Sequence, residues 1–219
     1  MTGRQRERPF VIGITGNIGT GKSTVAEMLV ALGADLIDAD KVAHRVMRPG
    51  SQVHADVVAA FGPRILTASG EIDRGELGKI VFGNPEALAR LEALVHPATI
   101  ERIGRRIATT SADVVVVEAI KLLESGLADV CDSVWVTTCR REQQVERLVD
   151  QRDLSPDEAR RRVDAQSSQA EKAARADVVI DNAGPLPATR EQVQAAWDHI
   201  VVEADVRRSC HPPDVGRFC

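Results

Sequence analysis

A glycine-rich segment near the N-terminus leaves few folds open to this chain. It reads Gly16-Asn17-Ile18-Gly19-Thr20-Gly21-Lys22-Ser23-Thr24. The apolar residues 10–14 before it predict a buried strand, and residues 25–32 after it predict a helix. A glycine loop that ends in Gly-Lys-Ser between a strand and a helix is typical of the phosphate-binding P-loop. The alternative is a glycine-rich turn with an incidental lysine, which gives no reason for the strand and the helix.

Each residue type in this loop has a chemical role. Glycine at Gly16, Gly19 and Gly21 allows backbone conformations that a Cβ atom would forbid, so N–H groups can turn inward around a phosphate. The N-terminus of the following helix adds positive potential. Lys22 can place its ammonium on the β- and γ-phosphate oxygens, and the Ser23 hydroxyl can bind Mg²⁺. The loop therefore predicts ATP and Mg²⁺ as cofactors, with the whole segment binding the nucleotide.

Acidic residues follow two further apolar runs. Asp38 and Asp40 come after Leu36-Ile37, and Glu118 ends a run of valines. Ligands of α/β proteins lie at the carboxyl ends of parallel strands, so the two aspartates are expected near the P-loop if their strand neighbours the first. Asp38 and Glu118 are then candidate Mg²⁺ ligands together with the serine of the loop. Alternatively, the aspartates form a turn that caps the next helix.

The alternation of apolar runs with helical patterns predicts an α/β fold, a five-stranded parallel sheet with flanking helices. The expected strands are residues 10–14, 36–37, 113–118, 133–137 and 178–180. The expected nucleotide-binding core comprises residues 9–48, 113–139 and 176–203.

Residues 49–112 are too many for a plain connection between two strands. Ser51 is expected to cap one helix, and Asn84 to cap another that Pro97 interrupts and that resumes at Thr99. The segment is therefore expected to be a helical subdomain that binds the second substrate.

Residues 140–175 are unusually rich in arginine and glutamine for a chain of negative net charge. They are expected to form a mobile lid whose guanidinium groups meet the transferring phosphoryl group. The alternative is a solvated helix face with ion pairs between residues four apart. After the lid, Thr189 is expected to start the last helix through a capping box, and residues 204–219 to form a disordered tail.

The composition argues against several other classes of protein. The net charge of the 219 residues is −4 and tyrosine is absent, so no nucleic-acid partner is expected. The four cysteines lack the spacing of a zinc site and predict reduced thiols. The basic N-terminal residues lead directly into the first strand rather than into a signal sequence, and no segment is long enough to span a bilayer. We therefore expect a cytoplasmic protein without a membrane partner, and the oligomeric state stays open.

Beyond the P-loop, several motifs resemble those of the dephospho-CoA kinases. They are Ile37-Asp38-Ala39-Asp40, Arg48-Pro49-Gly50, Leu94-Val95-His96-Pro97, Gln151-Arg152-Asp153 with Ala165-Gln166, and Ala176-Asp177-Val178-Val179-Ile180-Asp181-Asn182-Ala183-Gly184. The resemblance implies transfer of the γ-phosphoryl group of MgATP to the ribose 3′-hydroxyl of dephospho-CoA, the last step of coenzyme A synthesis.

The resemblance also implies roles for individual residues. Asp40 matches the general base of the family, and Arg147 and Arg152 match its lid arginines. Asn182 and Gly184 fall where the adenine loop of such kinases lies.

Two positions depart from the family pattern. Asn17 stands where glycine is commoner, and Ile120-Lys121-Leu122-Leu123-Glu124 stands where Pro-Leu-Leu-Phe-Glu is usual. Lys121 is then either a solvated lysine or a group that reaches a phosphate of the acceptor.

Two rival classes remain at this point. One is another small-molecule P-loop kinase, with a nucleotide or sugar as acceptor. The other is a regulatory GTP-binding switch, which should carry Asn-Lys-x-Asp for guanine. No such stretch occurs, and Asp-x-x-Gly appears only at residues 181–184, after the fifth strand.

Overall fold

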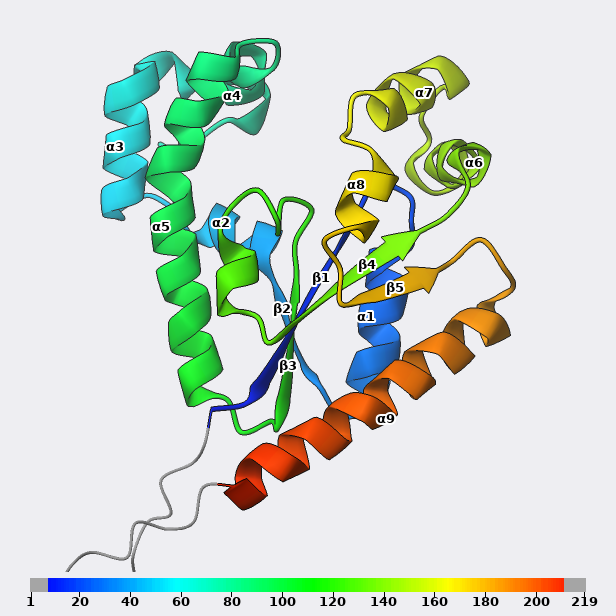
Figure 1. Ribbon diagram of the computed structural model, residues 1–219. Coiled ribbons are helices and arrows are strands. Elements are labelled where there is room, and N and C mark those ends of the chain that lie inside the picture. Colours follow the sequence, from blue (N-terminus) through cyan, green and yellow to red (C-terminus); the bar gives the residue numbers. More distant parts are fainter. Residues whose placement is uncertain (1–7, 211–219) are drawn as a thin grey trace, which may run out of the picture.

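The computed structural model describes residues 8–210, with residues 203–210 described by their backbone alone. Its centre is a parallel sheet of five strands in the order β2-β3-β1-β4-β5, flanked by helices (Figure 1). The strands are β1 (Phe10–Gly16), β2 (Asp35–Asp38), β3 (Val114–Glu118), β4 (Ser133–Thr138) and β5 (Val178–Asp181). The predicted fold class is confirmed, and the ends of each predicted strand move by only one or two residues.

The helices connect the strands and build two lobes above them. In chain order they are α1 (Lys22–Ala31), α2 (Ala39–Val46), α3 (Gln52–Phe61), η1 (Pro63–Ile65), α4 (Arg74–Val81), α5 (Pro85–Thr109), η2 (Leu127–Val130), α6 (Arg141–Arg152), α7 (Pro156–Asp164), α8 (Gln169–Ala173) and α9 (Leu186–Cys210).

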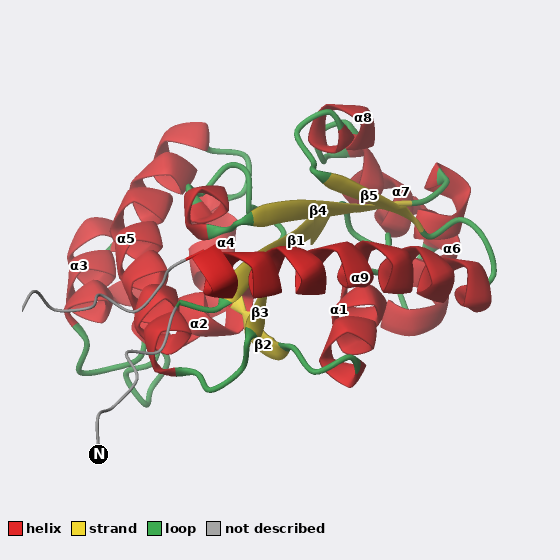
Figure 2. Ribbon diagram, turned by 60° about the horizontal axis from the view of Figure 1, so that its bottom comes forward, coloured by secondary structure: helices red, strands yellow, loops and turns green. Residues whose placement is uncertain are grey.

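Alternate residues of each strand point to opposite faces of the sheet and build two apolar cores. On one face, Ile12 and Ile14 of β1 pack with α1 and α9. Figure 2 shows α9 lying across this face. On the other face, Val115 and Val117 of β3 pack with α2 and with the C-terminal part of α5, where Ile103 is fully buried. The sheet is therefore covered on both sides, and its open edge is the carboxyl end of the strands, where the P-loop lies.

The helical subdomain predicted for the second substrate forms one of the two lobes. Helices α3 and α4 pack against the N-terminal half of α5 around Val57, Ile65 and Leu77. As predicted, Ser51 caps α3, accepting a hydrogen bond from the backbone N–H of His54 at 3.0 Å.

The predicted break at Pro97 is wrong, because α5 runs through this residue without interruption. Proline removes only one backbone donor, and α5 packs against α2, α3 and α4 along its length. The hydroxyl of Thr99 donates to the carbonyl of Val95 one turn earlier, at 2.8 Å. Packing of the whole helix outweighs the local cost of one missing hydrogen bond.

The predicted lid forms the second lobe, except for its last part. Helices α6 and α7 pack together around Leu148, Ala159 and Val163. Ile18 at the tip of the P-loop also packs into this small core. Helix α8 does not belong to the lobe, since it lies against β4.

The last helix differs from the prediction at both ends. It begins at Leu186 rather than at Thr189, whose buried hydroxyl donates instead to Oδ1 of Asn182. It continues to Cys210, so the tail predicted over 204–219 is helical up to residue 210. The rest of that predicted tail lies outside the described residues.

Two further sequence-based points concern membranes and thiols. Across residues 8–210, we find no helix with the length and apolar character needed to cross a bilayer. Cys131 and Cys139 are free thiols, as predicted.

Candidate active site

The P-loop has the geometry that the sequence predicts. Strand β1 ends at Gly16 and helix α1 begins at Lys22. Gly16, Gly19 and Gly21 have φ angles of 149°, 76° and 87°, a region that favours glycine. The first turn of α1 carries no acidic residue, so the positive end of the helix stays available to an anion.

The loop around Asn182 lies directly against the P-loop. A Cβ atom at Gly21 would lie 1.8 Å from Nδ2 of Asn182, so the packing as well as the backbone requires glycine there. Asn182 is buried and donates to the carbonyl of Thr20 at 3.0 Å. The predicted adenine loop is therefore fixed to the loop that is expected to hold the phosphates.

Arg147 connects the same two loops from the lid side. Its guanidinium donates to the carbonyl oxygens of Gly19 at 3.0 Å and of Asn182 at 2.8 Å. In this arrangement Arg147 holds the nucleotide loops together, and a direct contact with the phosphates stays a prediction. Gly184 lies in the same loop and is exposed.

Lys22 is buried inside the P-loop. Its Nζ donates to the carbonyl oxygens of Gly16 at 2.9 Å and Asn17 at 3.0 Å. Burial lowers the pKa of Lys22 to about 8. An ammonium held this way gains stabilisation when phosphate oxygens replace the carbonyls.

The charged groups around Lys22 come from separate parts of the chain. Beyond burial, the charges of Glu118 and Asp40 raise the pKa of Lys22, and those of Lys172 and Arg152 lower it. The fold thus brings the predicted metal ligand, general base and lid arginine into one electrostatic environment.

Two of the three predicted magnesium ligands are in contact. The hydroxyl of Ser23 donates to Oε1 of Glu118 at 2.8 Å. Among the side chains that the structure describes, residues 8–202, no three of His, Cys, Asp or Glu gather that could hold a metal ion by themselves. Mg²⁺ usually takes one or two carboxylates and completes its shell with waters and substrate phosphates. A hydroxyl and a carboxylate beside the P-loop fit that requirement.

Asp38, the third predicted ligand, caps helix α2. Its Oδ1 accepts from the backbone N–H of Lys41 at 2.9 Å, and Oδ2 pairs with the Lys41 ammonium at 2.9 Å. Desolvation is the largest influence on the pKa of Asp38 and raises it, but the bonds from Lys41 together outweigh desolvation, so the pKa is lowered. This is the capping alternative that the sequence left open, and a role in metal binding stays a prediction.

The two aspartates were expected near the P-loop if β2 neighbours β1. This condition is not met. Strand β3 is inserted between β1 and β2. Asp38 is therefore in register with Glu118 of β3 rather than with β1. The aspartates still lie at the carboxyl edge of the sheet, because all the strands are parallel.

Asp40 stands in the first turn of α2 and is open to solvent. Its pKa is raised, first by partial desolvation and then by the charge of Asp38, while His44 and Lys22 act in the opposite direction. A carboxylate near Lys22 with a raised pKa is suited to orient a hydroxyl group or accept its proton.

The lid arginines divide into two groups. Arg160 pairs with Asp157, and Arg161 and Arg162 both pair with Glu158. For these three, the alternative of a solvated helix face is correct. In contrast, no contact within residues 8–210 occupies the guanidinium of Arg152, which ends α6 and is exposed.

Three contacts of the site were not predicted. The backbone N–H of Ile18 donates to Oε1 of Gln166 at 2.7 Å, and Nδ2 of Asn17 donates to the carbonyl of Ser167 at 2.8 Å. Lys172 in α8 is buried near Lys22. Gln166 carried a signal in a family motif, whereas Lys172 lies in a helix too short to show periodicity.

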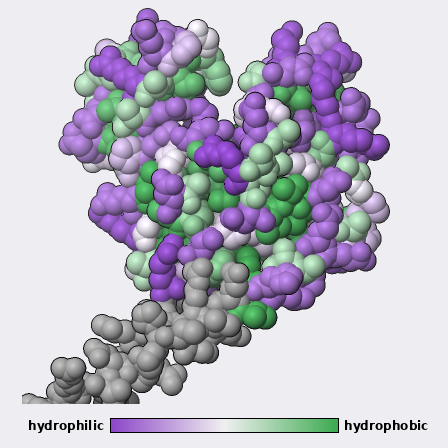
Figure 3. All heavy atoms as spheres, viewed as in Figure 1, coloured by the Kyte–Doolittle hydropathy of each residue, from purple (hydrophilic) through white to green (hydrophobic). Residues whose placement is uncertain are grey.

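A cleft of about 550 Å³ lies between α2 and the helical subdomain. Its ionisable wall residues are five basic ones, Lys41, His44, Arg45, Arg48 and Arg74, and one acidic one, Glu71. Its apolar wall residues include Met47, Leu77, Val81 and Leu91. Figure 3 shows a notch between the two upper lobes of the molecule, with hydrophilic and hydrophobic residues along its sides. The cleft belongs to the lobe of the helical subdomain, since no residue of the lid lines it. A long ligand that combines phosphates with a less polar arm would match these walls.

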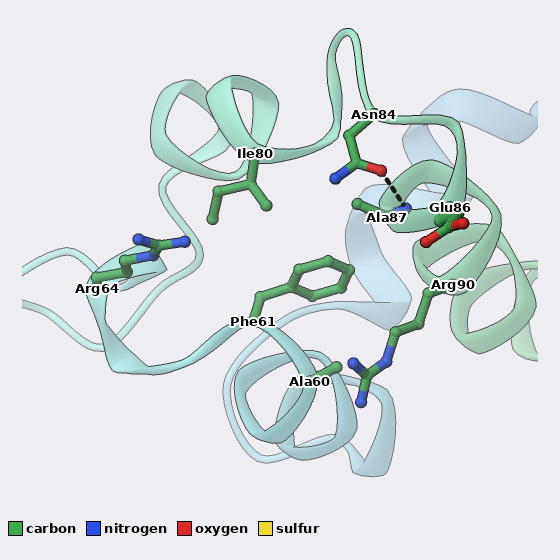
Figure 4. A pocket seen from close by; sticks show the side chains of 8 residues that line it. All are labelled: Ala60, Phe61, Arg64, Ile80, Asn84, Glu86, Ala87 and Arg90. Carbon is green, nitrogen blue, oxygen red and sulfur yellow. Dashed lines mark hydrogen bonds between the residues drawn. The ribbon is translucent and has the colours of Figure 1, made fainter.

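A second pocket of about 330 Å³ lies within the helical subdomain itself. Figure 4 shows the ring of Phe61 at its centre and Ile80 of α4 pointing toward it. Asn84 caps α5 at its rim, accepting from the backbone N–H of Ala87 at 3.1 Å. None of the predicted site residues lines this pocket.

Comparisons with known proteins agree with this site. A family model described as dephospho-CoA kinase matches residues 10–188. A dephospho-CoA kinase of Symbiobacterium thermophilum is 45% identical over 190 residues, which cover 85% of this chain and 80% of that protein.

Two solved structures extend the similarity to the fold. A protein from Thermus thermophilus has a TM-score of 0.76 and 32% identity, covering 90% of this chain and 98% of its own. A dephospho-CoA kinase from Campylobacter jejuni has a TM-score of 0.64 and 28% identity, covering 88% and 98%. With the family model spanning the P-loop, the cleft and the lid alike, this chain belongs to the dephospho-CoA kinase family, whose members catalyse the last step of coenzyme A synthesis.

Proposed function

We propose that this chain transfers the γ-phosphoryl group of MgATP to the ribose 3′-hydroxyl of dephospho-CoA in the cytoplasm. The observation that carries the proposal is the position of Asp40 in α2. The same helix contributes Lys41, His44 and Arg45 to the wall of the basic cleft, and Asp40 also lies close enough to Lys22 to affect its pKa. One carboxylate therefore stands where a phosphate donor and a phosphate-bearing acceptor would meet.

The P-loop is proposed to hold the donor. On nucleotide binding, Lys22 exchanges the carbonyls of Gly16 and Asn17 for phosphate oxygens. Ser23 and Glu118 would hold Mg²⁺, which neutralises charge on the β- and γ-phosphates. Arg147 and Asn182 keep the adenine loop against the P-loop, so that the base and the phosphates are bound by one rigid unit.

The basic cleft is proposed to hold the acceptor. Arg48 and Arg74 both line the cleft, and guanidinium groups bind phosphate oxygens in a fixed bidentate geometry. Met47 and Leu91 offer apolar surface to the pantetheine arm. Binding energy from this remote part of the acceptor can then orient the reacting hydroxyl beside Asp40.

The experiment that tests the acceptor is a product assay with MgATP and a panel of alcohols. Dephospho-CoA should be phosphorylated with a kcat/KM at least about a hundredfold above that of adenosine or AMP, which lack the pantetheine arm. Products are weighed by mass spectrometry, and the position of the new phosphate is read by NMR.

The panel also includes CMP, shikimate and gluconate as acceptors of the rival small-molecule kinases. Efficient phosphorylation of one of them, with dephospho-CoA inert, would leave only the nucleotide site of this proposal standing. The Arg48→Ala variant gives a second check, since it should raise KM for dephospho-CoA about tenfold and leave KM for ATP unchanged.

Arg152 provides a prediction for the lid. Its guanidinium is free within the described chain and lies in the field of Lys22, so closure of α6 and α7 should bring it onto the transferring phosphoryl group. Arg152→Ala should lower kcat by about thirtyfold or more and change KM for ATP by less than about threefold. Steady-state kinetics with ATP varied at saturating acceptor measures both values.

Arg160→Ala is the matched control for Arg152→Ala. It removes an exposed lid arginine whose partner is Asp157, and surface pairs of this kind contribute little. Its kcat should stay within about twofold of the unchanged protein. Equal losses in the two variants would mean that general lid stability, and not contact with phosphate, explains the effect of Arg152.

A further inference from the structure

Lys172 is a buried lysine to which the family resemblance gave no role. It lies in the short helix α8, and 6% of its side chain is exposed. Lysine is almost never buried without partners. Its Nζ donates to the carbonyl of Ile120 at 3.3 Å and pairs with Oε1 of Glu124 at 3.3 Å. Both partners belong to the same short loop, residues 119–126, which follows β3.

This β3 loop is anchored to the P-loop strand through the same atom. The carbonyl of Ile120 also accepts from the hydroxyl of Thr15 at 3.0 Å, and Thr15 directly precedes the first glycine of the P-loop. The loop begins directly after Glu118, which is bonded to Ser23. Its backbone is thus fixed between the proposed metal ligands and Lys172.

The β3 loop is also connected to the helical subdomain. Lys121 forms an ion pair with Glu92 of α5 and is exposed, in agreement with the alternative of a solvated lysine, while contact with a phosphate of the acceptor stays a prediction. On the side of α8, Arg175 donates to the carbonyl of Leu123 at 3.3 Å. The β3 loop therefore contacts β1, helix α8 with the residues that follow it, and α5 of the helical subdomain.

We propose that Lys172 is a positioning residue for phosphoryl transfer. It holds the β3 loop, and through this loop it keeps the helical subdomain in place relative to the ATP site. The ammonium of Lys172 is bonded to the carbonyl of Ile120 and to Glu124, both in this loop. The ion pair of Lys121 with Glu92 connects the loop to α5. The proposal rests on the function proposed above. It assigns Lys172 no contact with ATP or with the reacting atoms.

Its position near Lys22 supports the same role. The charge of Lys172 contributes to lowering the pKa of Lys22, so the charges of the two ammonium groups interact. Glu124 pairs with Lys172 and balances its charge. The site tolerates a second buried cation there because a carboxylate and a carbonyl satisfy it.

The experiment compares Lys172→Met with Lys172→Arg. Methionine keeps the length and most of the volume of the side chain but loses the charge and the donor groups. It should raise KM for dephospho-CoA by about tenfold, with KM for ATP within about twofold. Arginine retains the charge and can donate to the same carbonyl, so it should recover KM for dephospho-CoA to within about threefold.

Two further variants keep the result interpretable. Glu124→Gln removes the ion pair but leaves the bond to Ile120, and should raise KM for dephospho-CoA by about threefold even if Lys172→Met fails to fold. Lys79→Met removes an exposed lysine paired with Glu76 and should leave both KM values unchanged. Melting temperatures report whether each variant is folded.

The unchanged protein is assayed first with dephospho-CoA, which tests the proposed function by itself. If that activity is present, two results would overturn the role of Lys172. One is a rise in KM for ATP with KM for dephospho-CoA unchanged, which would make Lys172 a nucleotide ligand. The other is equal kinetics in folded Lys172→Met and the unchanged protein.

Discussion

Replacing Lys22 with alanine should lower kcat by about a hundredfold or more while the chain stays folded. The ammonium lies inside the P-loop, on the carbonyls of Gly16 and Asn17, where the β- and γ-phosphate oxygens are expected. Charge grows on these oxygens during transfer, and an ammonium in a site with little water stabilises that charge by several kcal/mol. The measurement is kcat with MgATP and dephospho-CoA both saturating.

The fold should survive this change for a reason visible in the structure. Burial already disfavours the charged form of Lys22, since it lowers the pKa to about 8. Removing the ammonium therefore relieves a desolvation cost, and the melting temperature should be unchanged or slightly higher. Lys79→Ala, at an exposed lysine, is the control and should keep full activity. Near-normal turnover in folded Lys22→Ala would contradict the P-loop assignment itself.

The P-loop could be predicted from the sequence because its signals are local. Gly16, Gly19 and Gly21 take the positive φ angles expected of them, and the apolar run before the loop became β1. Likewise, the valine run gave β3 with Glu118 at its carboxyl end. In each case the residues that specify the structure are adjacent in the chain.

Features that depend on distant contacts could not be predicted in this way. Nothing local to β2 says that β3 is inserted beside it, so the neighbours of Asp38 were misjudged. Pro97 is a helix breaker by itself, but packing along α5 holds the helix through it. The sequence around Thr189 is that of a capping box, yet its hydroxyl donates to Asn182 instead, and the helix begins one turn earlier.

The same distinction applies within the site. Arg147 and Arg152 are equivalent in the sequence as lid arginines, but the first is held by two carbonyls and the second is free among the described contacts. Lys172 is the opposite case, a residue without a local signal that becomes central once α8 packs against the β3 loop. Which basic residue is available to a phosphate is therefore decided by the fold, after the sequence has supplied the candidates.

Asp40→Asn should lower kcat by about a hundredfold to a thousandfold and leave the dissociation constant of MgATP within about twofold. Asparagine has nearly the same shape and can still accept a hydrogen bond from the acceptor hydroxyl, but it cannot take its proton. The helix α2 loses a favourable charge in its first turn, which costs at most about 1 kcal/mol. The loss should therefore appear in the chemical step, which single-turnover measurements isolate.

Asp38→Asn is the contrasting variant, two residues away. Asp38 caps α2 through Oδ1 and pairs with Lys41 through Oδ2. Asparagine can keep the cap but loses the exposed ion pair, so the melting temperature should fall only slightly. If Asp38 also binds Mg²⁺, the concentration of Mg²⁺ needed for half-maximal activity rises in Asp38→Asn and stays unchanged in Asp40→Asn. The reverse pattern, with weaker MgATP binding and normal transfer from bound ATP in Asp40→Asn, would make Asp40 a metal ligand. Replacement of a general base should abolish transfer and leave nucleotide binding intact. Asp40 suits this role better than Asp38, because Asp40 is exposed whereas both oxygens of Asp38 are already bonded to Lys41.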